Sequence, residues 1–241
     1  MLRLTTHTNA AAASHYFEAG HDYLAEGQER VASWEGDAAK LLGLEGAVTK
    51  EHFRLLAEGK DPLTGETLLR AERAARRVGT DFSFSAPKAV TLALEFTGDT
   101  RILDAFRAAV SDTMRDIEAE MEARVRVCGQ NENRVVGNAV WATFIHRTAR
   151  PVDGVADPSL HAHAFQFNLV RDEAEAKWKA AEIGQIRSDT NYWEAVMVSR
   201  LSKSMTDLGY AVKRDGRYFA LEGLGKPLLD KFSRRTQVIE A

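Results

Sequence analysis

Cysteine is almost absent from this sequence, since Cys128 is the only one among 241 residues. A single thiol cannot form a disulfide within the chain, and it cannot supply the several thiolates of a cysteine-based zinc site. The sequence also lacks any apolar run as long as a membrane span, and its first residues show no signal-peptide pattern. We therefore expect a protein of the reducing cytoplasm that does not insert into a membrane.

An excess of basic residues is lacking too, because the formal net charge at pH 7 is −3. This balance argues against a protein that coats nucleic acid without sequence preference, although it leaves room for a local basic groove. Hydrophobic residues make up 44% of the chain and charged residues 28%, as in ordinary globular proteins. The length predicts one domain with embellishments or two small ones.

What the chain does contain is a tight group of histidines. His161 and His163 stand in a run of nearly alternating apolar and polar residues, which predicts a β-strand with both rings on one face. His146 closes the preceding apolar run, so antiparallel pairing of the two strands would bring three imidazoles together. Such a set suits a divalent metal ion, whereas histidines on a half-buried strand without metal are the competing interpretation. The other four of the seven histidines all lie in the first quarter of the chain: His7, His15, His21 and His52.

A second candidate strand, Asp81–Ser85, is followed by a predicted helix with Pro87 in its first turn. If this strand neighbours the histidine strand, Asp81 can accept a proton from a ligating ring, as carboxylates beside metal-bound histidines usually do. Lys88, at the start of the helix, is a candidate cation for an anion such as phosphate. An ordinary capped helix explains the same residues equally well.

Basic residues gather in three further places, each suited to phosphate contacts on DNA. They are a predicted helix end, the flank of His146, and a predicted hairpin over 210–221 with Asp215 and Gly216 in its turn. Solvated faces and surface ion pairs are the competing interpretation in each case. The candidate DNA-binding residues are Arg70, Arg73, Arg76, Arg77, Lys88, Arg147, Lys213, Arg214 and Arg217.

The remaining periodic segments predict helices. Residues 9–25 carry Tyr16 and Tyr23 two helical turns apart, which places both phenols on one face about 10 Å from each other. A half-buried core stripe would show the same spacing. Further helices are predicted over 102–126, over 191–208 and from Lys226 onward, with short helices broken by glycine turns over 28–65.

Taken in order, several motifs resemble those of the MobF-type conjugative relaxases (the TrwC/TraI-like group), which belong to the His-hydrophobic-His endonuclease superfamily. The motifs follow the family's order over almost the whole chain, so the match is more specific than an isolated histidine pair. The matching segments are 14–18, 22–23, 34–36, 41–46, 81–90, 146–150, 160–163, 207–210 and 232–237.

The resemblance implies a DNA strand transferase that nicks one strand at a plasmid origin of transfer and stays attached to the 5′ phosphate. Tyr16 and Tyr23 match the nucleophilic tyrosines, and Arg150 matches an arginine beside the site. Asp81 matches a carboxylate that orients a ligand histidine or helps to deprotonate the tyrosine. The residues that match the metal ligands are His146, His161 and His163, with Mg²⁺ or Mn²⁺ expected and Zn²⁺, Ni²⁺ or another ion as alternatives.

The fold that the resemblance implies is α+β, with helices packed on a central antiparallel sheet and a mobile C-terminal helix and hairpin over bound single-stranded DNA. Residues 1–241 would then be a single relaxase domain without the helicase domain of relatives. Accessory relaxosome proteins and a coupling protein are further candidate partners. Where relatives often carry adjacent tyrosine pairs, Phe17 and Leu24 stand here, which leaves one candidate nucleophile in each pair.

Three other function classes remain open at this point. A rolling-circle replication initiator would use the same histidines and a tyrosine at a different origin. A metal hydrolase would use the histidines to activate water and would need no tyrosine. An inactive DNA-binding module would use neither.

Overall fold

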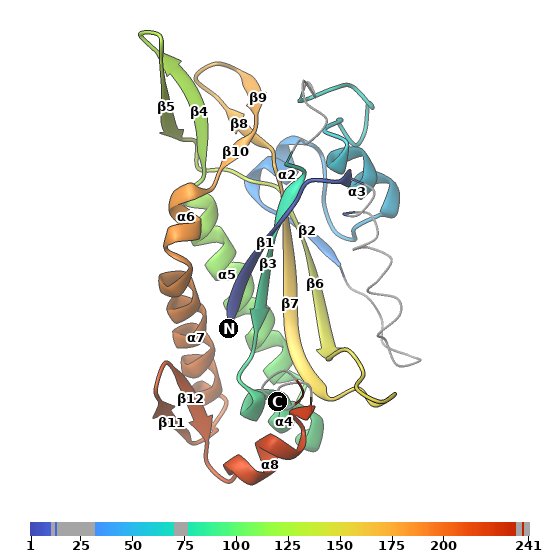
Figure 1. Ribbon diagram of the computed structural model, residues 1–241, viewed down its shortest axis with the longest axis vertical. Coiled ribbons are helices and arrows are strands. Elements are labelled where there is room, and N and C mark those ends of the chain that lie inside the picture. The colour runs from blue at the N-terminus through green and yellow to red at the C-terminus, as the bar shows by residue number, and fades with distance from the viewer. Residues whose placement is uncertain (11–12, 14–31, 70–76, 235–237, 239–241) are drawn as a thin grey trace.

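The centre of the protein is a five-stranded antiparallel sheet in the order β1-β3-β7-β6-β2 (Figure 1). The computed structural model describes residues 1–10, 13, 32–69, 77–234 and 238. The candidates Tyr16, Tyr23, Arg70, Arg73 and Arg76 lie outside these residues. The strands of this sheet are β1 Leu2–His7, β2 Ser33–Glu35, β3 Gly79–Ser85, β6 Trp141–Thr148 and β7 Pro158–Phe167.

Helices cover one face of this sheet (Figure 1). They are α4 Lys88–Thr97, α5 Arg101–Ala119 and α7 Thr190–Asp207. Alternate strand residues point toward them, among them the fully buried Phe82 and Phe84 of β3 and Ala162 of β7. Because α5 is amphipathic, its apolar stripe completes this core, and Asp104, Asp112 and Asp116 face solvent.

The opposite face of the sheet is packed at one end only, as far as the described residues show. Here α2 Asp37–Leu41 and α3 Lys50–Ala57 close a second core. The ring of Phe53 lies 6.1 Å from that of Phe144, 5.2 Å from that of Phe165 and 4.9 Å from that of Phe167. On this same face of the sheet, His146 follows Phe144 two residues along β6, and His163 precedes Phe165 by two residues on β7.

Smaller elements surround the central sheet. A second sheet has the order β10-β4-β5, and two hairpins pair β8 with β9 and β11 with β12. None of the described helices combines the length and apolar character needed to cross a membrane. The bounds are β4 Glu122–Val127, β5 Gln130–Val135, β8 Val170–Asp172, β9 Lys177–Lys179, β10 Ala181–Glu182, α6 Gly184–Ser188, β11 Val212–Asp215, β12 Tyr218–Leu221 and α8 Lys226–Lys231.

Three sequence-based predictions about elements are wrong. The helix predicted over 102–126 ends at Ala119, and β4 begins at Glu122, because Ala123 and Val125 alternate with solvent-facing neighbours at the strand period. The segment predicted as short helices contains the strand β2. In the hairpin, Asp215 pairs with Tyr218, so the turn residues are Gly216 and Arg217. Gly216 takes the positive φ of 57° that such a two-residue turn requires.

Buried Glu118 ties α5 to the far face of the sheet. Its Oε1 accepts hydrogen bonds from the backbone N–H groups of Asp37, at 2.6 Å, and Ala139, at 2.8 Å. Burial raises the pKa of this carboxyl above its usual range, and the two N–H donors oppose that rise. The folded state therefore holds this proton more tightly than the unfolded chain does.

This raised pKa predicts a pH dependence of stability. As pH rises from about 4.5 through the folded pKa, wild type loses stability relative to Glu118→Gln, whose amide oxygen still accepts both hydrogen bonds. Urea unfolding of both proteins over this pH range measures the difference. The exposed neighbour Glu120 serves as control, since Glu120→Gln is expected to follow wild type. Parallel wild-type and Glu118→Gln curves would contradict the prediction.

Candidate metal centre

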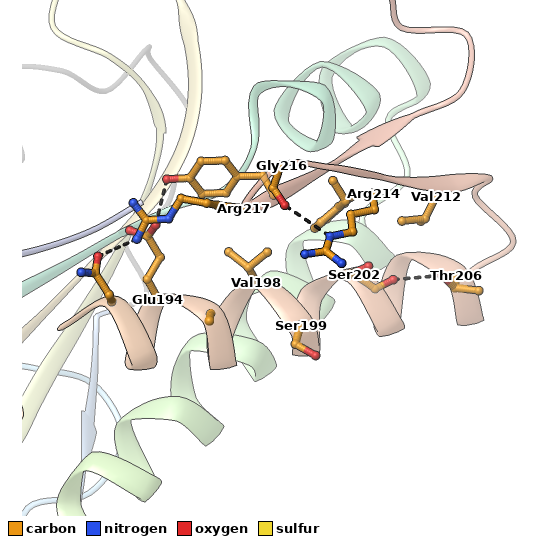
Figure 2. Close-up of a pocket in the computed structure, with 13 residues that line it drawn as sticks. Glu194, Val198, Ser199, Ser202, Thr206, Val212, Arg214, Gly216 and Arg217 are labelled. Atoms are coloured by element: carbon orange, nitrogen blue, oxygen red, sulfur yellow. Dashed lines mark hydrogen bonds between the residues drawn. The ribbon is translucent and has the colours of Figure 1, made fainter. Parts of the chain in front are cut away.

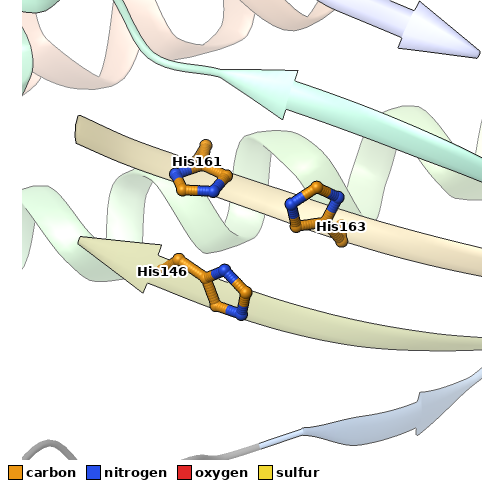
Figure 3. Close-up of side chains that lie close together, drawn as sticks. All are labelled: His146, His161 and His163. Atoms are coloured by element: carbon orange, nitrogen blue, oxygen red, sulfur yellow. The ribbon is translucent and has the colours of Figure 1, made fainter. Parts of the chain in front are cut away.

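Three histidine side chains from two neighbouring strands point toward one another (Figure 3). His146 of β6 stands directly opposite His161 of β7 in the antiparallel register, and His163 follows two residues along the same face. The ring centroids are 5.1 Å apart for two of the pairs and 5.3 Å apart for His146 and His163. One ring nitrogen from each residue lies within 4.8 Å of the others. The predicted convergence of the three rings is confirmed.

Hydrogen bonds fix which nitrogen of two rings faces the centre. His161 Nδ1 lies 2.9 Å from the backbone oxygen of Ser159, and His163 Nδ1 lies 2.9 Å from Asp81 Oδ2. Because both partners are acceptors, Nδ1 is the donor in each ring, and in the neutral form of the ring this leaves the lone pair on Nε2. The expectation that Asp81 lies beside a ring of this strand is confirmed, since β3 pairs with β7.

Ser83 also belongs to this arrangement, although it is not among the candidate site residues that the sequence indicates. It pairs directly with His163 across β3 and β7. Its hydroxyl donates to Asp81 Oδ2 at 2.6 Å, and its oxygen lies 3.1 Å from His163 Nδ1. The signal was present in the alternation of Asp81–Ser85, which puts Asp81 and Ser83 on one face.

His7 is a fourth histidine on the same face of the sheet, on β1. Burial lowers its pKa, the nearby carboxylate of Asp81 raises it, and His163 lowers it again. His7 is therefore neutral at neutral pH, and its pKa depends on the charges of Asp81 and His163. Nothing in its sequence position in the first quarter of the chain indicated this, because only the β1–β3 pairing brings it there.

Three of the predicted DNA-binding cations have structural contacts away from the histidines. Arg77 donates to Asn168 Oδ1 at 3.1 Å and to the backbone oxygen of Ala181. Lys88 Nζ donates to the backbone oxygens of Pro158, at 2.7 Å, and Phe232, at 2.8 Å, so it joins α4 to the end of α8. Arg147 pairs with Glu95 of α4 at 2.8 Å, on the face opposite the histidines. Arg147 thus forms a surface ion pair, and its phosphate contact stays a prediction.

The basic hairpin also lies away from the histidines. Between α7 and this hairpin runs a groove of about 730 Å³, lined by Arg214 and Arg217 together with Glu194 and small side chains of α7 (Figure 2). Arg217 donates to Asn191 Oδ1 at 2.6 Å, and Lys213 is exposed. Because α7 covers the helical face of the sheet, these cations are not brought to the histidine cluster.

The role predicted for Arg150 beside the site stays a prediction. Arg150 is exposed in the loop that joins β6 to β7, at the same end of the sheet as His146 and His161. Within this loop Val152 and Val155 exchange two backbone hydrogen bonds of 3.0 Å across a turn. The loop therefore carries defined local structure next to the cluster.

Comparisons with known proteins point to one family. The family model described as TrwC relaxase matches residues 10–241. The multifunctional conjugation protein TraI of Escherichia coli is 33% identical over an alignment of 253 residues, gaps included. The alignment covers 99% of this chain and 14% of TraI. TraI of Escherichia coli strain K12 is 32% identical with the same coverage. The chain thus spans only a small part of these curated relatives.

Solved structures agree with this match. The chain is similar to the conjugative relaxase TrwC in complex with OriT DNA in its metal-bound structure, with a TM-score of 0.88, 31% identity, and coverage of 100% of this chain and 82% of that one. A metal-free structure of the same complex gives a TM-score of 0.87 at 30% identity, with coverage of 100% and 81%. A copper-bound structure gives 0.88 at 32%, with coverage of 100% and 82%.

Proposed function

Since the chain belongs to the TrwC relaxase family, we propose that it is a conjugative relaxase that nicks single-stranded DNA at a plasmid origin of transfer. In this role a tyrosine of the chain becomes joined to the 5′ phosphate, and a free 3′ hydroxyl can later reverse the reaction. Residues 1–241 would act as one strand-transferase domain. The observation that carries the proposal is the cluster of His146, His161 and His163 with Asp81 behind it.

The residues present fit a divalent metal ion. Three imidazoles present nitrogen ligands from one side, and acceptors hold the Nδ1 atoms of two of the rings. When bound there, the ion would supply Lewis-acid stabilisation for the charge on the scissile phosphate. The donor set admits Mg²⁺ or Mn²⁺ as well as softer ions such as Zn²⁺, Ni²⁺ or Cu²⁺.

The chain must also activate its nucleophile. A tyrosine phenol has a reference pKa of about 10, so it needs a proton acceptor near neutral pH. The phenol oxygen attacks phosphorus, the bond from phosphorus to the 3′ oxygen breaks, and the leaving oxygen takes up a proton. Asp81 is only 3% exposed, and its Oδ2 is already bound by His163 and Ser83. These contacts favour the orienting role for Asp81 and leave deprotonation to water or another group.

One assay separates the proposal from the other function classes. A single strand carrying the origin is incubated with the protein and Mg²⁺ or Mn²⁺, then denatured and analysed for a covalent protein–DNA adduct. A relaxase gives the adduct, and a metal hydrolase cuts without one. An inactive module shifts the DNA uncut. A replication initiator would give the adduct on a replication origin instead, so both origins are tested in parallel.

The contacts of Ser83 yield a further prediction. Replacing Ser83 with alanine removes the donor to Asp81 and one neighbour of His163 Nδ1, so the ring is held less firmly. We expect Mn²⁺ affinity, measured by calorimetry without DNA, to fall about tenfold. Ser83→Thr keeps the hydroxyl and should restore the affinity. Ser85→Ala removes a hydroxyl from the same strand face and serves as control, and an equal loss there would contradict the prediction.

A further inference from the structure

We propose that Arg3 binds a backbone phosphate of the single DNA strand that crosses the histidine face of the central sheet. The nature of this ligand rests on the proposed function. The position of Arg3 beside the histidines does not depend on the proposed function, because it follows from the strand register. Arg3 lies outside all the sequence motifs described above.

The strand register places Arg3 beside the candidate metal centre. Arg3 of β1 pairs with Ser83 of β3, which in turn pairs with His163 of β7. Directly paired residues in antiparallel strands point to the same face, so Arg3 shares the face of His163. Two steps between strands put its Cα about 10 Å from that of His163, and its long side chain can reach part of that distance.

Arg3 is exposed, and it carries a positive charge on the histidine face of the sheet close to the three histidines. Its neighbour Leu2 is buried against the helices, in keeping with the alternation along β1. The backbone of Arg3 pairs with that of Ser83, but its guanidinium makes no hydrogen bond or ion pair with any residue that the structure describes. Asp81, the acidic residue of the adjoining strand, is buried beneath the surface and bound by Ser83 and His163. The guanidinium is therefore available to an anion from outside.

A DNA phosphate is the anion that this place suits best. Guanidinium binds phosphate through paired hydrogen bonds, and hydroxyl groups are common secondary contacts to the DNA backbone. Thr5 on β1 is exposed and shares the face of Arg3, as does the half-buried Ser85 on β3. The alternative is that Arg3 merely protects an edge strand, since β1 lies at the edge of the sheet.

The test measures DNA binding by fluorescence anisotropy over a series of NaCl concentrations. The probe is a fluorescein-labelled mixed-sequence single strand, with Mn²⁺ present and the full chain as the protein. For Arg3→Gln we expect affinity about tenfold weaker and a log–log salt slope shallower by about 0.7, the value for one phosphate contact on a single strand. Arg3→Lys should keep the slope and recover part of the affinity.

The control is Arg115→Gln, which removes an equal charge from an exposed arginine of α5 on the helical side of the sheet. Melting curves establish that each variant is folded. If Arg3→Gln binds as wild type does, or if Arg115→Gln loses as much, the inference is overturned and edge protection stands. The adduct assay runs separately with wild type. Absence of the adduct together with weaker binding by Arg3→Gln would reject the relaxase proposal and retain the phosphate contact.

Discussion

Replacing His163 with alanine is expected to lower Mn²⁺ affinity by about 100-fold or more and to abolish the covalent adduct at the metal concentrations that suffice for wild type. The variant loses one of three imidazoles, and it also leaves Asp81 and Ser83 without the ring that they hold. Loss of a residue that only orients a ligand costs about 10- to 100-fold in affinity, so loss of a ligand should cost at least as much. Calorimetry with Mn²⁺ and the adduct assay measure the two effects.

The matched control for this prediction is His52→Ala. His52 lies on α3, and its removal takes an imidazole from a helix outside the cluster. It should leave both metal affinity and adduct yield as in wild type. Adduct formation by His163→Ala at wild-type metal concentrations, or by wild type in excess chelator, would refute a role for the cluster in the reaction.

The Tyr16→Phe variant is expected to form no adduct at all, because it lacks the oxygen that would be joined to phosphorus. The assignment of Tyr16 rests on the sequence and on the family resemblance, since the residue lies outside the part of the chain that the structure describes. The phenyl ring keeps the shape and apolar surface of the side chain. Metal affinity and DNA binding should therefore stay near wild type while the denaturation-resistant product disappears.

Tyr23→Phe provides the comparison. If Tyr16 is the first nucleophile and Tyr23 serves a second transfer, Tyr23→Phe still forms the first adduct. The second-transfer assay adds a competing strand to the wild-type adduct and to the Tyr23→Phe adduct, and only the wild type should pass efficiently to a second product. Adduct formation by Tyr16→Phe at the wild-type level would contradict this assignment and make Tyr23 the first nucleophile.

Much of the histidine site could be predicted from local patterns. His161 and His163 stand two residues apart in an alternating run, and this spacing alone puts both rings on one face. The same reasoning joined Asp81 to the site once its strand was placed next to β7. Predictions for long helices held where the apolar period was unbroken, as for α7, and failed where the period changed to that of a strand, as after Ala119.

The contacts that the basic residues make within the fold could not be predicted in the same way. Arg77, Lys88 and Arg147 are basic residues near the right motifs, yet in the fold they bind backbone oxygens, an amide oxygen or a carboxylate elsewhere. A charge pattern in the sequence does not reveal which face of a strand or helix meets solvent. Nor does it reveal which carbonyl a lysine will reach across the fold, because both depend on elements distant in the chain.

By itself the sequence determined the period of each strand and therefore which residues share a face, because side-chain direction along a strand depends only on local backbone geometry. It also determined the donor chemistry, three imidazoles and no paired thiols. Only the tertiary structure decided which strands are neighbours, and with that the meeting of His7, Ser83 and Arg3 with the cluster. Strand order depends on how the whole chain buries its apolar faces, and this is a property of long-range packing that no local pattern contains.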